Sequence, residues 1–285
     1  MKRLFLLSIL GIFLLGACSD DKIGPSIIDT SPPELNEIDQ YIRTNYTEPY
    51  NIEVIYRYKE SLGDLYYNLV PPKRELVVPL LEVIRRAWIE PYLQLGGDYF
   101  FKTYVPHQIY LSGSPGVNND GTIVQGTAEG GVKIVLYQVN DFSKSNQEMF
   151  QRYFHIMHHE FAHILHQTKA YPAGYKKISE EITKNGKYTA VWFNFSDKEA
   201  NERGFITNYA MNSPDEDFVE MIAVMLTHTR KDWDDLINAV PVPGRTALRK
   251  KEEEVSNYFE KIWKINLYEL QELISLKIEE ITNEE

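Results

Sequence analysis

Residues 155–166 read His-Ile-Met-His-His-Glu-Phe-Ala-His-Ile-Leu-His and contain five of the seven histidines in the chain. They lie within Gln147 to Gln167, whose apolar pattern predicts one long, largely buried helix. From His159 to His163 the sequence matches the motif H-E-x-x-H. Residues four apart share a helix face, so His159 and His163 can bind one metal ion. Glu160 then lies beside a water held by that ion, where it can act as a general base.

Among the histidines, only the pair His159 and His163 has a glutamate where the general base is needed. His155 and His159 are also four apart, but Ile156 occupies the position that a general base would need. The histidines could also serve only in packing or at the surface. The buried character of the helix and the acidic segment downstream favour a metal site, and the ligand types favour zinc.

A catalytic zinc site has three protein ligands and a water, so a third ligand must lie outside the H-E-x-x-H motif. The metzincin continuation H-E-x-x-H-x-x-G-x-x-H is absent, because His166 replaces its glycine and Lys169 its last histidine. His166 shares the helix face, but one straight helix cannot arrange three imidazoles around one ion. We therefore expect His166 to support a ligand from outside or to line the cleft.

Glu216 and Glu220 are the better candidates for the remaining positions. They lie four apart on a predicted helix that begins at Pro214. Each also has a structural interpretation, because Ser213 and Glu216 form a capping-box pattern and Glu220 fits a solvated helix face. A second acidic helix after H-E-x-x-H is nevertheless the feature that glutamate-type zincins (gluzincins) need.

The N-terminal segment has the pattern of an export signal. Two basic residues precede an apolar run from Leu4 to Leu15, which is too short to span a bilayer as a mature helix. The run ends at Leu15-Gly16-Ala17-Cys18, which resembles the lipobox of bacterial lipoproteins. We therefore predict lipidation of Cys18, the only cysteine in the chain. The alternative is a soluble secreted protein that is cut nearby.

The chain is expected to have three parts. Residues 1–17 would be the lipoprotein signal peptide and residues 18–34 a lipid-anchored tether with glycines and prolines. Residues 35–285 contain no repeat and no low-complexity break, and they would form a single metallohydrolase domain.

Charge excludes one class of partner. Removal of residues 1–17 lowers the Lys+Arg count from 30 to 28 against 41 Asp+Glu, which gives a net charge of −13. Nucleic-acid binding needs a basic face, so we expect no nucleic-acid partner. A single cysteine allows no internal disulfide, so the fold must depend on its apolar core, and 43% hydrophobic residues are enough for one.

The predicted elements favour an α+β fold, with a small mixed sheet, an active-site helix and a helical C-terminal part. Period-two and apolar patterns predict strands at 51–58, 107–111 and 132–139, and helical patterns predict helices at 35–46, 75–92, 147–167, 216–227, 246–263 and 267–282. The strand at 132–139 could pair with an extended substrate or be an ordinary core strand. Gly126 to Gly131 would then form a cleft rim or a turn.

Tyr209, Glu216 and Glu220 follow one another at offsets of seven and four, and this spacing resembles the catalytic segment of the anthrax lethal factor family. The resemblance implies that Tyr209 stabilises an oxyanion, that Glu216 binds zinc and that Glu220 supports the site from outside. The separation of His163 and Glu216 is longer than in thermolysin-like enzymes, so an insertion must leave the site and return.

From the lipobox to the glutamate helix, the sequence resembles zinc metallohydrolase lipoproteins of Bacteroidota that occur with outer-membrane nutrient importers. The resemblance implies a zincin-like metallopeptidase fold, a cell-surface location in the outer membrane and an importer complex as a partner. It also implies cleavage of peptide or protein substrates by a zinc-activated water. Hydrolysis of non-peptide amides on glycoconjugates, and a catalytically weak role as an accessory of the importer, remain alternatives.

Overall fold

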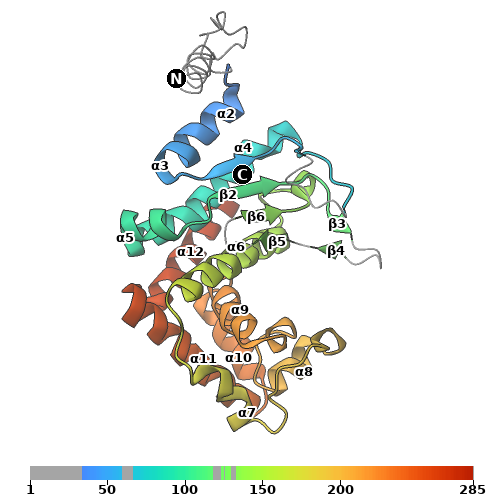
Figure 1. The fold of residues 1–285 in the computed structure, drawn as a ribbon, viewed down its shortest axis with the longest axis vertical. Helices are drawn as coiled ribbons and strands as arrows, with labels where there is room; N and C mark the ends of the chain where they lie inside the picture. The colour runs from blue at the N-terminus through green and yellow to red at the C-terminus, as the bar shows by residue number, and fades with distance from the viewer. Residues whose placement is uncertain (1–33, 60–66, 118–122, 125, 130–132, 285) are drawn as a thin grey trace, which may run out of the picture. The chain divides into compact units, whose positions relative to one another are not determined.

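The main sheet of the protein has four strands in the order β1-β2-β6-β5 (Figure 1). β1, β2 and β6 run parallel to one another, whereas β5 runs antiparallel to β6. The strands are β1 (Glu53–Ile55), β2 (Gln108–Leu111), β5 (Gly126–Glu129) and β6 (Lys133–Leu136). A separate antiparallel ribbon joins β3 (Gly116–Val117) to β4 (Ile123–Val124). This small mixed sheet, together with many helices, confirms the α+β class.

The structure is a computed structural model that describes residues 34–59, 67–117, 123–124, 126–129 and 133–284. Every element named here belongs to one compact unit, Asn36–Glu285. The predicted signal peptide, Cys18 and almost all of the predicted tether lie outside the described residues. None of the helices in the described ranges is long and apolar enough to cross a membrane.

Both faces of the sheet are buried. Because successive side chains along a strand point to opposite faces, neighbouring residues belong to different clusters. Ile109 and Ile134 contribute to the main core on one face. Tyr110 and Val135 belong to a second, smaller cluster on the other face. Burial on both faces explains why β2 and β6 have apolar sequences rather than a strict alternation with polar residues.

The position of β6 corrects one expectation from the sequence. β6 lies between β2 and β5 and pairs with both, so it cannot add a substrate strand, and the interpretation of 132–139 as a substrate-binding edge was wrong. The alternative, an apolar core strand, is confirmed by the burial of Ile134 and Leu136. Residues 126–129, which we expected to form a rim or a turn, are the edge strand β5.

Besides the strands, the described residues of the first half of the chain form two interrupted helical segments. The first is α2 (Glu37–Ile42), the π-helical turn η1 (Arg43–Thr47) and α3 (Glu48–Tyr50). The second is α4 (Arg74–Ile84), the π-helical turn η2 (Arg85–Ile89) and α5 (Glu90–Tyr104). α5 continues well beyond the helix predicted at 75–92, although Gly97 breaks its helical geometry with a φ of 78°.

Two helices that are distant in sequence pack side by side, and both were predicted. They are α6 (Gln147–Thr168) and α9 (Pro214–Leu226). The side chain of Asn146 accepts a hydrogen bond from the Met149 amide at the start of α6. Ser213 caps α9 in the same way, because its hydroxyl accepts a hydrogen bond from the Glu216 amide. These caps fix where each helix begins and therefore which residues face the partner helix.

An aromatic cluster holds the opposite face of α6. Phe161 makes edge contacts with Trp88, Tyr92, Phe100 and Phe101, with ring centroids 4.9–6.1 Å apart. All five side chains are buried. Phe161 is two residues from each motif histidine, so it lies on nearly the opposite face of α6. Its packing therefore fixes the rotation of α6 and points the histidines toward α9.

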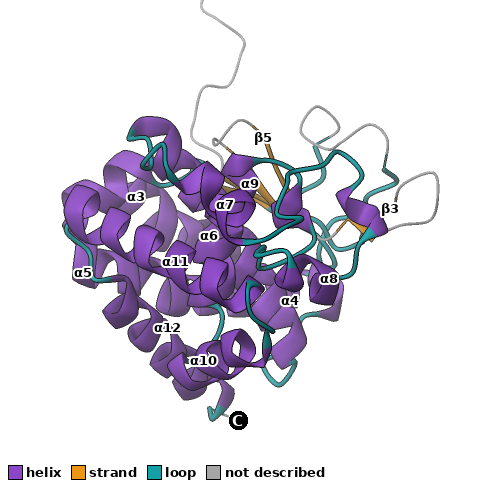
Figure 2. Ribbon diagram, turned by 90° about the horizontal axis from the view of Figure 1, so that it is seen from below, coloured by secondary structure: helices purple, strands orange, loops and turns teal. Residues whose placement is uncertain are grey.

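Helices make up most of the described chain, particularly its second half (Figure 2). Both predicted C-terminal helices are present, as α11 (Gly244–Tyr258) with η7 (Phe259–Trp263), and as α12 (Leu267–Thr282). Shorter elements that we did not predict are η3 (Val139–Asp141), η4 (Tyr175–Lys177), α7 (Ile178–Ile182), η5 (Trp192–Asn194), α8 (Asp197–Glu202), η6 (Tyr209–Met211) and α10 (Arg230–Ala239).

A buried ion pair joins α11 to α9. Lys251 and Asp217 both have no exposed side-chain surface, and the Lys251 Nζ lies 2.6 Å from the Asp217 Oδ2. The same ammonium donates a hydrogen bond of 2.7 Å to the carbonyl of Gly204. Gly204 has a φ of +84°, and a Cβ there would lie 2.6 Å from the Cβ of Ala247, so both conformation and space require glycine.

Candidate metal centre

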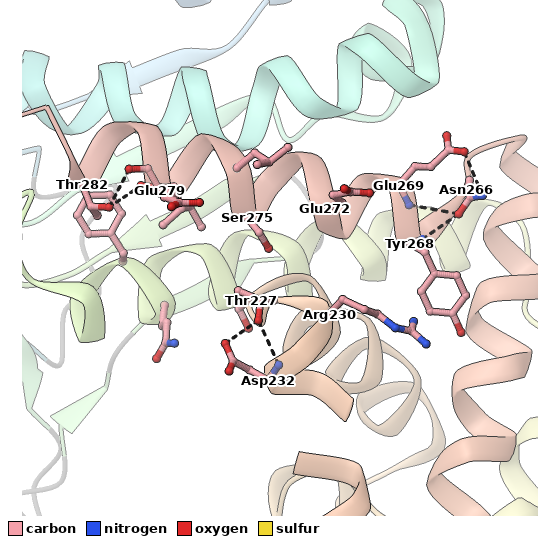
Figure 3. A pocket seen from close by; sticks show the side chains of 15 residues that line it. Thr227, Arg230, Asp232, Asn266, Tyr268, Glu269, Glu272, Ser275, Glu279 and Thr282 are labelled. Carbon is pink, nitrogen blue, oxygen red and sulfur yellow. Dashed lines mark hydrogen bonds between the residues drawn. The ribbon is translucent and has the colours of Figure 1, made fainter. Parts of the chain in front are cut away.

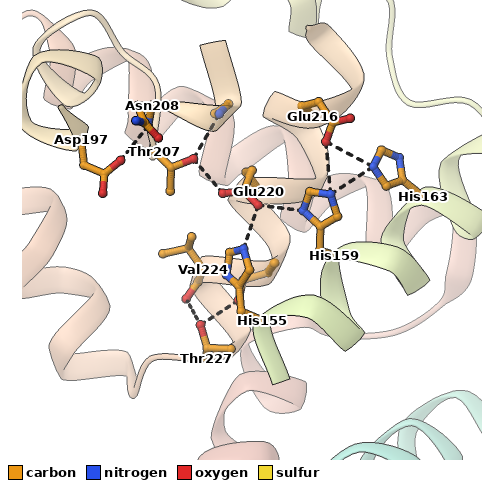
Figure 4. A network of polar contacts seen from close by, with 12 residues as sticks. His155, His159, His163, Asp197, Thr207, Asn208, Glu216, Glu220, Val224 and Thr227 are labelled. Atoms are coloured by element: carbon orange, nitrogen blue, oxygen red, sulfur yellow. Dashed lines mark hydrogen bonds and ion pairs between the residues drawn. The ribbon is translucent and has the colours of Figure 1, made fainter. Parts of the chain in front are cut away.

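α6 and α9 bring three of the predicted ligands together (Figure 4). The Nε2 of His159 lies 3.1 Å from Glu216 Oε2, and the Nε2 of His163 lies 3.3 Å from the same oxygen. The two Nε2 atoms are 3.2 Å apart. The three atoms therefore form a nearly equilateral triangle, as predicted from the H-E-x-x-H motif and the acidic helix.

This triangle fits a zinc ion. Zinc takes nitrogen and oxygen ligands at about 2.0–2.1 Å, and tetrahedral geometry then places the ligand atoms about 3.3 Å from one another. The three observed separations, 3.1–3.3 Å, agree with that value. Other divalent first-row transition metals also bind such ligands. Two imidazoles and a carboxylate in tetrahedral positions are nevertheless typical of catalytic zinc.

The hydrogen-bond pattern also calls for a cation at the centre of the triangle. Nδ1 of His159 lies 2.7 Å from Glu220 Oε1, and a carboxylate only accepts, so Nδ1 carries the hydrogen. The lone pair of Nε2 then faces the Glu216 carboxylate. Without a metal ion, only a proton relieves this repulsion. Burial disfavours a charged His159, but its hydrogen bonds to Glu216 and Glu220 prevail and raise its pKa to about 10. One proton cannot satisfy three converging acceptors, whereas one zinc ion can.

Glu220, which we expected to support a histidine ligand from outside, lies within hydrogen-bond distance of His159. Its side chain is buried on α9, and its second oxygen, Oε2, accepts a hydrogen bond of 2.7 Å from the Thr207 hydroxyl. Burial disfavours the ionised carboxylate, but His155 and His159 outweigh burial and hold the pKa of Glu220 far below its usual range. Glu220 therefore remains an anion that fixes the orientation of the His159 ring.

His155 is a contact that the sequence analysis missed. Its Nε2 lies 2.8 Å from Glu220 Oε1, the oxygen that also faces His159 (Figure 4). His155, His159 and Glu220 form a second group with converging ligand atoms. Two imidazole donors on one carboxylate oxygen account for this group without a second ion. The spacing of four from His155 to His159 places both rings on one helix face, but the sequence does not show that this face meets Glu220.

His166 supports the other histidine ligand. Its Nε2 lies 3.0 Å from Nδ1 of His163, within hydrogen-bond distance. Burial lowers the pKa of His166, and the neighbouring His163 lowers it further, so the ring is neutral and can accept the hydrogen of His163. The Tyr171 ring packs edge-on against His166, with centroids 5.5 Å apart, and the Tyr171 hydroxyl donates a hydrogen bond to Asp215.

The two residues with predicted catalytic roles lie beside the triangle. The ring of Tyr209 stacks on the ring of His159, with centroids 5.9 Å apart. Burial, followed by the negative charge of Glu216, raises the pKa of Tyr209, so its hydroxyl keeps its hydrogen. Glu160 is half-buried next to His159, and burial raises its pKa. Within the described ranges its carboxyl group forms no hydrogen bond or ion pair, which leaves it available to a water or a substrate.

His158 belongs to the core rather than to the metal centre. It is fully buried, and its Nδ1 lies 3.0 Å from the hydroxyl of Tyr92. Burial lowers the pKa of His158 to about 3, so the ring is neutral. A cavity of about 900 Å³ opens away from these histidines, between α12 and the start of α10 (Figure 3). Arg230, Asp232 and Glu272 are among its lining residues, and none of the metal-centre residues is.

Comparisons with known proteins agree with this centre. Residues 31–268 match the protein family described as "Putative zinc-binding metallo-peptidase". A solved structure from Bacteroides caccae with the same description is 36% identical to this chain, with a TM-score of 0.75. The similarity covers 90% of this chain and 97% of that one. No curated protein sequence matches. The extent of the family match and the level of identity show that this chain belongs to that family of zinc-binding metallo-peptidases.

Proposed function

We propose that this protein is a surface lipoprotein that hydrolyses peptide bonds as a gluzincin, with zinc held by His159, His163 and Glu216. The observation that carries the proposal is the triangle of ligand atoms with Glu160 beside it. When bound, zinc supplies Lewis-acid chemistry, because it lowers the pKa of a water and polarises a carbonyl group.

The residues around the triangle supply the remaining chemistry. Glu160 takes the proton of the attacking water, and its raised pKa suits this role because a stronger base accepts the proton more readily. After the water has added to the carbonyl carbon, Glu160 returns the proton to the leaving amine. The Tyr209 hydroxyl, which keeps its hydrogen, donates a hydrogen bond to the oxyanion. Glu220 and His166 hold the two histidines in orientation.

The location forms part of the same proposal. Lipidation of Cys18 after removal of residues 1–17 would anchor the domain to the outer membrane through the segment 18–34. There the enzyme would work beside a nutrient importer and supply it with products. Support for this part comes from the sequence pattern and its resemblance to importer-associated lipoproteins. Labelling with a fatty-acid probe in wild type and in Cys18→Ala would test it, and equal labelling of both would contradict it.

The test of the chemistry is Glu160→Gln in the purified domain. We expect a loss of at least about a hundredfold in peptide cleavage, while zinc stays near one ion per chain. Glu148→Gln is the matched control, because Glu148 is an exposed carboxylate on the same helix. If Glu160→Gln still cleaved peptides, the assignment of Glu160 as the general base would be wrong. Cleavage of glycoconjugate amides but not of peptides would move the proposal to that substrate class.

A further inference from the structure

A short segment next to the metal centre exposes a continuous apolar surface. We name Val191, Trp192 and Phe193 the aromatic rim. Val191 is 48% exposed and Phe193 is 63% exposed, whereas Trp192 is half-buried and packs against the main core. The rings of Trp192 and Phe193 meet edge to face, with centroids 5.9 Å apart. The rim thus has one anchored ring and two side chains open to solvent.

Ring contacts connect the rim to the metal centre. Trp192 packs edge-on against Tyr209, with centroids 4.9 Å apart, and Tyr209 stacks on His159 at 5.9 Å. A chain of ring contacts therefore runs from His159, a proposed zinc ligand, through Tyr209 to Trp192, beside the exposed apolar surface of Val191 and Phe193. A substrate carbonyl bound at Tyr209 would bring the neighbouring substrate side chain within reach of this surface.

Two hydrogen bonds, one between backbone groups and one from a side-chain amide, hold the rim in place relative to Tyr209. The amide of Thr189, before the rim, donates to the carbonyl of Met211 at 2.8 Å. After the rim, the side-chain amide of Asn208 donates to the carbonyl of Phe195 at 2.8 Å. Both partners lie within three residues of Tyr209. The rim is therefore preorganised, and a ligand that binds it does not have to order a loose loop.

Scattered exposed apolar residues are ordinary on protein surfaces and need no explanation. The rim differs because its residues are consecutive, ordered and continuous with the metal centre. Tyr99 provides the comparison, because it is 82% exposed on α5 and has no ring contact among the described residues. The rim is also uncharged, so it offers only carbon surface and ring faces to a ligand.

We propose that the aromatic rim is a specificity subsite that binds a large apolar or aromatic side chain of the peptide, next to the bond that is cleaved. This inference rests on the proposed function, because it assumes that a peptide occupies the metal centre. It narrows the substrate class to peptides with such a residue beside the scissile bond. The physical reason is the removal of Phe193 and Val191 from water when a matching side chain covers them.

The experiment compares two peptides that differ only in having Phe or Ala beside the scissile bond. Wild type should prefer the Phe peptide, and Phe193→Ala should lower the ratio of the two kcat/KM values roughly tenfold. Tyr99→Ala is the matched control and should leave the ratio unchanged. Zinc content should stay at one ion per chain in all three proteins. An unchanged ratio in Phe193→Ala would overturn the subsite.

A second readout separates this inference from the proposed function. Binding of both peptides is measured by calorimetry to zinc-loaded Glu160→Gln, with and without Phe193→Ala. Weaker binding of the Phe peptide alone supports the subsite even if wild type cleaves no peptide, which would refute only the proposed function. Equal binding of both peptides, with or without Phe193, overturns the subsite even if cleavage is observed.

Discussion

Replacement of Lys251 by methionine should destabilise the protein strongly, although Lys251 lies outside the metal centre. Its ammonium group lies 2.6 and 2.8 Å from the two oxygens of Asp217 and 2.7 Å from the Gly204 carbonyl, and both charged side chains are fully buried. Methionine fills a similar volume but supplies no donor. Among the described residues, Asp217 would then keep one side-chain donor, the Tyr188 hydroxyl at 2.9 Å.

The size of the effect follows from burial. An unpaired charge in a protein interior costs about 3–5 kcal/mol when its partner is removed. For a domain of this size, 1 kcal/mol corresponds to about 2–4 °C in Tm, so Lys251→Met should lower the Tm by roughly 10 °C. Burial already raises the pKa of Asp217, so the variant should take up a proton there and recover part of the loss at lower pH.

The assay is urea unfolding followed by circular dichroism in saturating zinc, with a matched control and a double variant. Lys250→Met is the control, because Lys250 lies on the surface of the same helix, and its stability should equal that of wild type. Adding Asp217→Asn to Lys251→Met should restore part of the loss, because no buried charge is left unpaired. A loss below about 1 kcal/mol for Lys251→Met, or no recovery in the double variant, would refute this reasoning.

Three further predictions concern the metal centre. Glu216→Ala should lower zinc affinity far more than Glu220→Ala, for which about 10- to 100-fold is expected, and chelator competition would reveal equal or reversed losses if ligand and support were exchanged. His155→Ala should weaken zinc binding by about tenfold, because Glu220 loses one of the two imidazoles that fix it, and unchanged affinity would exclude that role. In metal-free protein the pKa of His159 is raised to about 10 from an ordinary 6.5, so its contribution to stability is complete below pH 6.5 and is lost as pH rises toward 10. Urea midpoints in a chelator should therefore fall across that range, and a flat or rising profile would contradict the assignment.

Local spacing made the core of the centre predictable from the sequence. His159 and His163 share a face of α6 because they are four residues apart, and α9 begins at Pro214 where its cap was expected. The comparisons confirm the family and its metal, whereas the roles assigned to individual residues stay predictions. The contact between His155 and Glu220 was not predictable, because it depends on how α9 is placed against α6.

Other features depend on packing between distant segments. Of the four residues of β5, only Thr127 has an intrinsic preference for strands, and the pairing with β6 is what makes the segment a strand. Lys251 and Asp217 are residue types that are normally exposed, so their burial could not be inferred from α11 or α9 alone. The aromatic rim is a short segment with too little periodicity to predict, so its position beside Tyr209 could not be inferred from the sequence.

Metal binding at this centre also affects the stability of the fold, in a chain whose single cysteine allows no internal disulfide. Its proposed ligands come from two helices, and His163 and Glu216 are 53 positions apart in the sequence. A bound ion therefore acts as a cross-link that closes this long loop, as a disulfide does in other proteins. By the same chain-entropy relation, closure of a loop of this length restricts the unfolded chain by about 4 kcal/mol at 25 °C. Zinc would then stabilise the fold as well as take part in catalysis. Chelation of zinc should expose the segment between His163 and Glu216 to proteases before the rest of the domain.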